Sequence, residues 1–325
     1  KIRVLLNRPY QLNSYLHHST PSIGVALFAD HTGTVEDLLK QADLAMYRAK
    51  AAGRNTLRFF DQDMQTIVAA RAAMERDFHD AVLREAFVLH YQAQVNAVGD
   101  IMGVEALVRW QHPESGIVSP AEFIPLAEEN GLILPLGYWV LKTACHQLAI
   151  WSAYPDMAHL SIAVNVSARQ FMLPTFVDEI LALLAHTGAN PQRLKLELTE
   201  SILVDDVEDI IGKMTALKAK GVRFSLDDFG TGYSSLSYLQ QLPVTEIKID
   251  RLFVRGIDRN TRDAALVSAI VSLGHSLGLR VVAEGVETAA HLDVLRRQGC
   301  DLAQGFHFSP PLPWEEFVKA YPPAG

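Results

Sequence analysis

The sequence alternates between short apolar, β-prone segments and longer amphipathic helical segments. Eight strand-like segments follow one another mostly at about 20 to 35 residues, the size of one βα unit; they span residues 87–95, 102–110, 160–166, 194–198, 222–226, 246–249, 280–283 and 302–308. Helical patterns lie between most of them, at residues 135–151, 176–186, 207–220, 262–277 and 289–298. This alternation predicts an α/β fold, a (β/α)8 TIM-like barrel.

The first two strand-like segments depart from this regular pattern. The stretch between residues 95 and 102 is too short for the crossover that joins parallel strands, so we predict a hairpin. The barrel is therefore expected to contain one antiparallel strand. Further along, Ser119-Pro120-Ala121-Glu122 matches a capping box with proline at the first helical position, which predicts a helix start.

Residues 1–60 carry a smaller β-α-β pattern, with strands at 22–28 and 56–60 and a helix that ends near Gly53. This piece is too small to build a good core alone. Residues 61–86 have a helical pattern throughout, which predicts a connecting helix. That helix either transmits geometry between domains or serves as a spacer. The expected division is a small α/β fragment at 1–60, a helical linker at 61–75 and the barrel at 76–325.

Composition restricts the classes of function. The chain is 49% hydrophobic and 20% charged, an ordinary balance for a soluble globular protein, and its net charge of −8 argues against binding a nucleic-acid polymer. Cys145 and Cys300 lack metal or redox spacing, which predicts reduced core residues of a cytoplasmic protein. The chain starts without Met, so we expect a fragment whose parent could be membrane-anchored through a segment upstream of Lys1.

Polar residues stand at the ends of successive predicted strands, where a barrel places its active site. They are Glu105, Asn165, Glu197, Asp227, Asp228, Lys248 and Glu284, and Arg109 follows in the strand of Glu105. Singly, each could be a turn cap or part of a structural salt bridge. Together, converging acids repel one another unless cations lie among them.

Oxygen donors without His or Cys favour Mg²⁺ or Mn²⁺ over Zn²⁺. The adjacent Asp227 and Asp228 suit a pair of ions about 3.5–4 Å apart, the geometry used to hydrolyse phosphodiesters. In such a site Arg109 would contact a phosphate oxygen, and Lys248 would orient or help deprotonate the attacking water.

The motif EALVRW at residues 105–110 resembles the name-giving motif of the EAL domain family, the cyclic di-GMP phosphodiesterases. Around it, in family order, stand the motifs YQAQV before it and NVSARQF, LELTES, DDFGTGYSSL, IKID, AEGVE and QGFHFSPPLP after it, and the resemblance covers residues 76–323. It implies hydrolysis of cyclic di-GMP to linear pGpG with two Mg²⁺ or Mn²⁺ ions, as part of bacterial second-messenger signalling. We expect Ca²⁺ to bind but to inhibit, since it tolerates looser coordination.

The resemblance also implies roles for individual residues. Four residues would bind one metal ion: Glu105, Asn165, Glu197 and Asp227. Asp227 and Asp228 would bind the second ion, with Lys248 and Glu284 near the attacking water. The implied substrate contacts are Gln92, Arg109, Asp250 and, more weakly, Gln304, with Glu287 a further weak assignment. Glu200 matches the residue that holds the DDFGTG loop in its active shape, and the segment 231–241 resembles the family's dimer-forming region, so a homodimer is expected.

Two positions depart from the family pattern. Ala93 stands where proline is usual, and Pro310 stands where a basic residue is common. Neither change removes a metal ligand.

The residues SIGVA at 22–26 and ADLAMYRAKAAGRN at 42–55 resemble the C-terminal end of a GGDEF (diguanylate cyclase) domain. The GGDEF motif itself is absent from residues 1–60, so this fragment is not predicted to make cyclic dinucleotide.

The complete set of acidic positions favours an active phosphodiesterase. The main alternative is a catalytically silent cyclic di-GMP receptor that binds the nucleotide and signals through the linker helix. A third alternative is an oligomerisation platform, which would bind no nucleotide.

Overall fold

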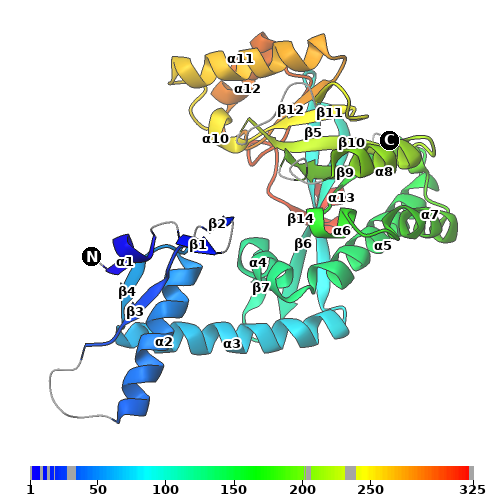
Figure 1. The fold of residues 1–325 in the computed structure, drawn as a ribbon. Helices are drawn as coiled ribbons and strands as arrows, with labels where there is room; N and C mark the ends of the chain where they lie inside the picture. The colour runs from blue at the N-terminus through cyan, green and yellow to red at the C-terminus, as the bar shows by residue number, and fades with distance from the viewer. Residues whose placement is uncertain are drawn as a thin grey trace. The chain divides into compact units, whose positions relative to one another are not determined.

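The computed structural model describes residues 2–7, 10–12, 15–17, 19–27, 34–200, 202, 206–230 and 239–321. The chain divides into two compact units, Lys1–Asp80 and Ala81–Gly325. Figure 1 shows the elements of each unit as a ribbon. Among the described residues, no helix combines the length and the apolar character needed to cross a membrane.

The first unit contains the predicted β-α-β arrangement. Strands β3 (Ile23–Val25) and β4 (Leu57–Phe59) pair in parallel, and helix α2 (Val35–Ala51) connects them. Helix α2 begins with a capping box, in which Thr34 and Asp37 bond to each other's backbone amides. The remaining elements are helix α1 (Ile2–Leu6) and the antiparallel strands β1 (Tyr10–Leu12) and β2 (Tyr15–His17).

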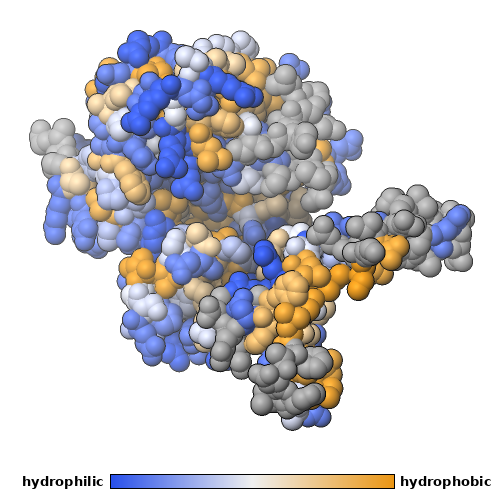
Figure 2. Space-filling view, turned by 90° about the vertical axis from the view of Figure 1, so that its left-hand side faces the viewer, coloured by the Kyte–Doolittle hydropathy of each residue, from blue (hydrophilic) through white to orange (hydrophobic). Residues whose placement is uncertain are grey.

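Strand β3 packs closely on helix α2. A Cβ atom on Gly24 would lie 1.9 Å from the Ala42 carbonyl oxygen, so only glycine fits at this position. The core of this unit is nevertheless small. Among residues 2–80, the described fully buried apolar side chains are Ala45, Ala49 and Phe78. Large hydrophobic side chains of this unit are exposed, and Figure 2 shows where hydrophobic residues reach the visible surface.

The helix predicted at residues 61–86 is α3 (Gln62–Leu83). The Arg71 guanidinium of α3 lies 5.7 Å from the centre of the Tyr47 ring of α2, a cation–π distance. Arg71 also pairs with Glu75 one turn later. The domain boundaries predicted at residues 60 and 75 stay predictions.

The second unit is a closed barrel of eight strands. They are β5 (Phe87–Asn96), β6 (Ile101–His112), β8 (Ser161–Asn165), β9 (Leu194–Thr199), β10 (Arg223–Phe229), β11 (Glu246–Ile249), β12 (Arg280–Ala283) and β13 (Leu302–Ala303). Neighbours from β6 to β13 pair in parallel, whereas β5 pairs antiparallel with both β6 and β13 and so closes the barrel. The predicted barrel with one antiparallel strand is confirmed.

The helices around the barrel agree closely with the predicted segments, and Figure 1 shows them outside the strands. They are α5 (Ile133–Ser152), α7 (Phe176–Thr187), α8 (Val207–Lys218), α11 (Thr261–Ser276) and α12 (Ala289–Gln298). The shorter elements are β7 (Gly116–Val118), α4 (Pro120–Asn130), α6 (Ala168–Phe171), η1 (Pro191–Arg193), α10 (Arg251–Val254), β14 (Leu312–Pro313) and α13 (Trp314–Ala320).

Two local predictions were wrong in part. Ser119 precedes α4 with Pro120 at the first helical position, but its side chain makes no capping hydrogen bond. The last barrel strand ends at Ala303 rather than at residue 308, because the backbone turns at Gly305, whose carbonyl accepts from the Phe308 amide. A Cβ atom on Gly305 would lie 2.2 Å from the Val286 carbonyl oxygen, so this turn requires glycine.

Candidate active site

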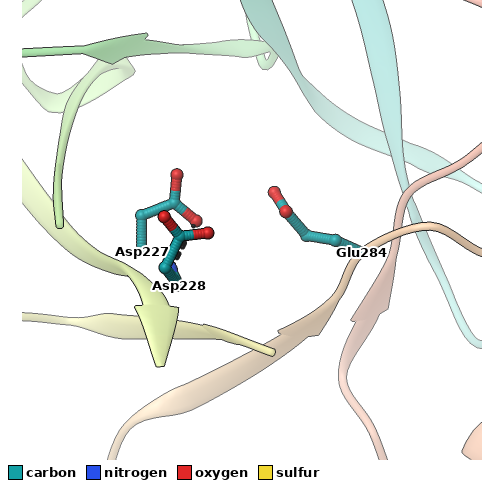
Figure 3. A group of neighbouring side chains, drawn as sticks. All are labelled: Asp227, Asp228 and Glu284. Carbon is teal, nitrogen blue, oxygen red and sulfur yellow. Dashed lines mark hydrogen bonds between the residues drawn. The ribbon is translucent and has the colours of Figure 1, made fainter. Parts of the chain in front are cut away.

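The polar residues predicted at the strand ends meet at one end of the barrel. Asp227 and Asp228 lie near the end of β10, and Glu284 follows β12 directly. Figure 3 shows the Glu284 carboxylate pointing toward the two aspartates. Oxygens of these three residues lie within 4.8 Å of one another. This group is an acidic cluster with the chemistry of a metal site.

Lys248, from β11, lies at the centre of the acidic residues. Its Nζ atom is 2.5 Å from Glu284 Oε1, 2.7 Å from Glu197 Oε2, 3.4 Å from Asp227 Oδ1 and 3.5 Å from Glu105 Oε2. The lysine side chain is fully buried. One ammonium therefore forms ion pairs with four carboxylates, which come from four different strands or strand ends.

Burial and charge shift the pKa values of these groups in different directions. Burial would lower the pKa of Lys248, but the surrounding carboxylates outweigh it and raise that pKa well above its ordinary value. Burial raises the pKa of Glu197 well above its ordinary value, and it raises that of Glu284 to about 7. The pKa of Asp228 rises to about 6 through burial and the neighbouring Asp227 charge. A cation bound among these carboxylates would favour their charged forms and so oppose the shifts that burial causes.

Glu105 differs from the other acids because several donors face it. The Asn165 side-chain amide donates to Glu105 Oε1 at 2.6 Å, and the Gln304 amide donates to Glu105 Oε2. Burial alone would raise the pKa of Glu105, but Lys248 and these two hydrogen bonds together lower it. Glu105 is thus held as a carboxylate in a fixed orientation.

The Asp227–Asp228 pair depends on an unusual backbone conformation. Asp228 has a φ of 54°, a left-handed value that non-glycine residues seldom adopt. Its backbone amide donates to Asp227 Oδ1 at 2.9 Å. Two residues later, the Gly230 amide donates to Glu200 Oε1 at 3.0 Å. Residues 231–238, which include most of the segment predicted to form a dimer, lie outside the described residues.

A cavity of about 560 Å³ opens over the acidic cluster. It is lined by eight of the predicted or weakly assigned site residues, namely Gln92, Glu105, Asp227, Asp228, Asp250, Glu284, Glu287 and Gln304. Lys248 lies beneath it, fully buried. Arg109 does not line this cavity, and its Nη1 atom donates to the Val108 carbonyl at 2.8 Å.

Asn165 and Glu197 line a second cavity, of about 350 Å³, beside β6 and α5. Leu107 borders both cavities. Arg251 and Phe306 also line the cavity of about 560 Å³, and neither was among the predicted site residues. Arg251 directly follows Asp250 at a strand end, and Phe306 lies in the motif QGFHF. Both positions could therefore have been predicted to lie near the site.

The residues at this site suit divalent cations that prefer oxygen ligands. The donors are carboxylates and one amide, and Lys248 occupies the charge-neutralising position among them. Glu197 Oε1 is buried and has no hydrogen-bond partner among the described atoms. A buried carboxylate oxygen without a donor is a costly arrangement that a cation would satisfy. Asn165 donates through Nδ2, which leaves its oxygen for a cation.

The fold and the site together define a mixed α/β barrel protein with an acidic site suited to divalent cations. The EAL domain family matches residues 75–311, and the diguanylate cyclase GGDEF domain family matches residues 2–56. The chain belongs to the EAL domain family, and a short GGDEF portion precedes that domain. The recognition made from the sequence motifs is confirmed.

Relatives of known name support this membership. The bifunctional diguanylate cyclase/cyclic di-GMP phosphodiesterase MucR of Pseudomonas aeruginosa is 43% identical over 318 residues, which cover 97% of this chain and 46% of MucR. The cyclic di-GMP phosphodiesterase PdeR of Escherichia coli is 36% identical over 321 residues, which cover 99% of this chain and 48% of PdeR. The chain therefore spans less than half the length of these relatives.

Solved structures show the same barrel. The PaMucR phosphodiesterase in complex with c-di-GMP is 46% identical, with a TM-score of 0.72 over 74% of this chain and 98% of that one. The EAL enzyme Bd1971 in its cAMP- and cyclic-di-GMP-bound form is 31% identical, with a TM-score of 0.73 over 89% of this chain and 76% of that one.

Proposed function

We propose that this protein hydrolyses cyclic di-GMP to linear pGpG with two divalent cations, Mg²⁺ or Mn²⁺. The observation that carries the proposal is the convergence of four carboxylates on the buried ammonium of Lys248, beneath a cavity in the barrel mouth. The names of the MucR and PdeR relatives and the c-di-GMP complex of PaMucR support this substrate.

The proposed cation ligands are the oxygens of Glu105, Asn165, Glu197, Asp227 and Asp228. Divalent cations held there would neutralise phosphate charge and make a water molecule easier to deprotonate. We expect Mg²⁺ and Mn²⁺ to support turnover and Ca²⁺ to inhibit it. The donor set supports hard cations, because it contains oxygen atoms alone.

Side chains of the protein would accept the proton of the attacking water and bind the phosphate groups of the substrate. Glu284, whose pKa is about 7, would accept the proton of the attacking water, and the Lys248 ammonium, 2.5 Å from Glu284 Oε1, would orient that water. Arg251, which lines the cavity, would contact a phosphate oxygen, since a guanidinium matches phosphate geometry. Arg109 would do so only after its side chain turns from the Val108 carbonyl toward the cavity. Gln92, Asp250 and Gln304 line the cavity and are proposed substrate contacts. Through its bond to the Gly230 amide, Glu200 would hold the backbone beside Asp228.

Hydrolysis of cyclic di-GMP in Mg²⁺, with product identified by mass and EDTA as the control, tests this function. We expect metal-dependent release of pGpG. Tight nucleotide binding without product would instead establish the alternative, a catalytically silent receptor. Absence of both binding and product would leave the oligomerisation platform as the remaining candidate.

The remaining expectations concern the setting of the enzyme. We expect a cytoplasmic location and a homodimer formed through the segment after Asp228. Sedimentation of the purified protein, with and without nucleotide, would test the dimer.

A further inference from the structure

A second polar layer lies inside the barrel beneath the acidic site. Lys195 is two residues before Glu197 on β9, and Glu246 is two residues before Lys248 on β11. Because strand side chains alternate between faces, both point into the barrel like the site residues above them. On the antiparallel strand β5, Gln94 follows Gln92 by two residues. All three deep side chains are buried, with at most 1% exposed.

Hydrogen bonds connect this layer to the acidic site. Lys195 pairs with Glu246 and donates to Gln94 Oε1 at 3.1 Å. The Gln94 amide nitrogen then donates to Gln304 Oε1 at 3.0 Å. The Gln304 amide nitrogen donates both to Gln92 Oε1, at 3.0 Å, and to Glu105 Oε2. A continuous path therefore leads from Lys195 to a predicted metal ligand.

The chemistry of the groups gives this path a direction. A lysine ammonium has three donors and no acceptor, so the group that faces it must present an oxygen. Gln94 consequently turns its oxygen toward Lys195 and its NH₂ group toward Gln304. Gln304 must then present its own oxygen to Gln94, which leaves its NH₂ group to face Glu105. A flipped Gln304 would place an amide oxygen against the Glu105 carboxylate.

The opposite end of the path is also held in place. Glu246 Oε2 lies 3.3 Å from Arg280 Nη2, and the Arg280 side chain is 41% exposed. The Lys195 ammonium is thus neutralised by a carboxylate that has a second cation of its own. A buried ammonium needs such a counter-charge, so the Glu246 carboxylate fixes the position from which Lys195 donates to Gln94.

We propose that Lys195 and Gln94 are positioning residues that orient the Gln304 amide and, through it, the Glu105 carboxylate for cation binding. This inference rests on the proposed metal site. Partners of metal ligands commonly influence metal affinity about 10- to 100-fold, so the effect should be measurable.

The test is the affinity of the nucleotide-free protein for Mn²⁺, measured by calorimetry on the whole chain. Gln94→Met removes the side-chain amide oxygen and nitrogen at similar volume and leaves the Lys195–Glu246 pair intact. We expect its Mn²⁺ dissociation constant to rise about tenfold. The double variant Lys195→Met, Glu246→Leu should show a similar loss, and it leaves no buried charge unpaired.

Ser225→Ala is the matched control. Ser225 is fully buried on β10, and its hydroxyl has no hydrogen-bond partner among the described atoms. Its removal should leave Mn²⁺ affinity within twofold of the parent, because the path does not pass through it. Thermal unfolding followed by circular dichroism would show that each variant is folded.

The outcomes separate this inference from the proposed activity. Parental Mn²⁺ affinity in both folded variants would overturn the positioning role. A parent protein that binds Mn²⁺ but hydrolyses no cyclic di-GMP, with weakened binding in the variants, would support the positioning role and overturn the proposed activity. A parent that binds no Mn²⁺ would overturn both.

Discussion

The Nζ atom of Lys248 lies 2.5 Å from the Oε1 atom of Glu284, yet the pKa of that glutamate is raised rather than lowered. Burial and the neighbouring carboxylates outweigh the attraction of a single ammonium that is shared among four acids. The acidic site therefore carries more negative charge than its own lysine can compensate. This imbalance makes its stability and its cation affinity depend on pH.

The metal-free protein should lose stability as pH rises from about 4.5 to about 7. Glu284 has its ordinary pKa near 4.5 when unfolded and about 7 when folded, so the folded state binds more protons within this window. The free energy of unfolding should fall by an amount on the order of 2–3 kcal/mol. Urea unfolding in EDTA at the two ends of the window measures it.

Glu284→Gln provides the control for that titration, because glutamine keeps the shape and removes the proton equilibrium. The difference in unfolding free energy between parent and variant should change with pH in the stated direction. A pH-independent difference would show that the Glu284 carboxyl does not titrate within this window.

Glu105→Ala should abolish hydrolysis of cyclic di-GMP. The change removes a carboxylate that accepts from both Asn165 and Gln304, and with it a proposed cation ligand. Initial rates in Mg²⁺ measure the loss. Glu208→Ala, an exposed acid on α8, should retain the parental rate and controls for lost negative charge. Normal activity in Glu105→Ala would contradict the metal assignment.

Substitutions at Asp228 should separate the carboxylate from the backbone conformation. Asparagine tolerates the left-handed region about as well as aspartate, so Asp228→Asn should stay folded while losing activity. Asp228→Ala should additionally lose roughly 1 kcal/mol of stability, since alanine is strained at a φ of 54°. Denaturant unfolding of the two variants compares these costs. Equal stability of the two would argue against strain at this position.

Replacement of Mg²⁺ by Ca²⁺ should lower turnover while nucleotide and cation still bind. Ca²⁺ accepts longer and more irregular oxygen coordination than Mg²⁺ does. Rates in Mg²⁺ with increasing Ca²⁺ should fall toward zero, and calorimetry should show that Ca²⁺ occupies the site. Equal rates with both ions would contradict this expectation.

The sequence predicted the barrel well because most strands are short and rich in apolar residues and the helices between them are amphipathic. On β9, Leu194, Leu196 and Leu198 are all buried and alternate with Lys195 and Glu197. The last strand was predicted too long, because the apolar pattern continues past Ala303 while the backbone turns at Gly305. Such a turn depends on tertiary contact with Val286, which periodicity does not report.

The acidic site was predictable for a related reason. Polar residues that follow apolar strand segments stand out, and barrel topology brings strand ends together. The arrangement of four acids around Lys248 was not predictable, since it depends on distances across the barrel. The deeper path through Lys195 and Gln94 was also missed, because alternation within a strand does not reveal which partners face each other across the barrel interior.

The pairing of the antiparallel strand β5 affects how the barrel can fold during synthesis on the ribosome. It pairs with β6, which follows it directly in the chain, but its other edge pairs with β13 and β14, more than 200 residues later. During synthesis this edge stays unpaired until residues 302–313 have been made, and unpaired strand edges can pair with wrong partners. A ribosome that stops before Leu302 would release a chain whose barrel has no closing seam.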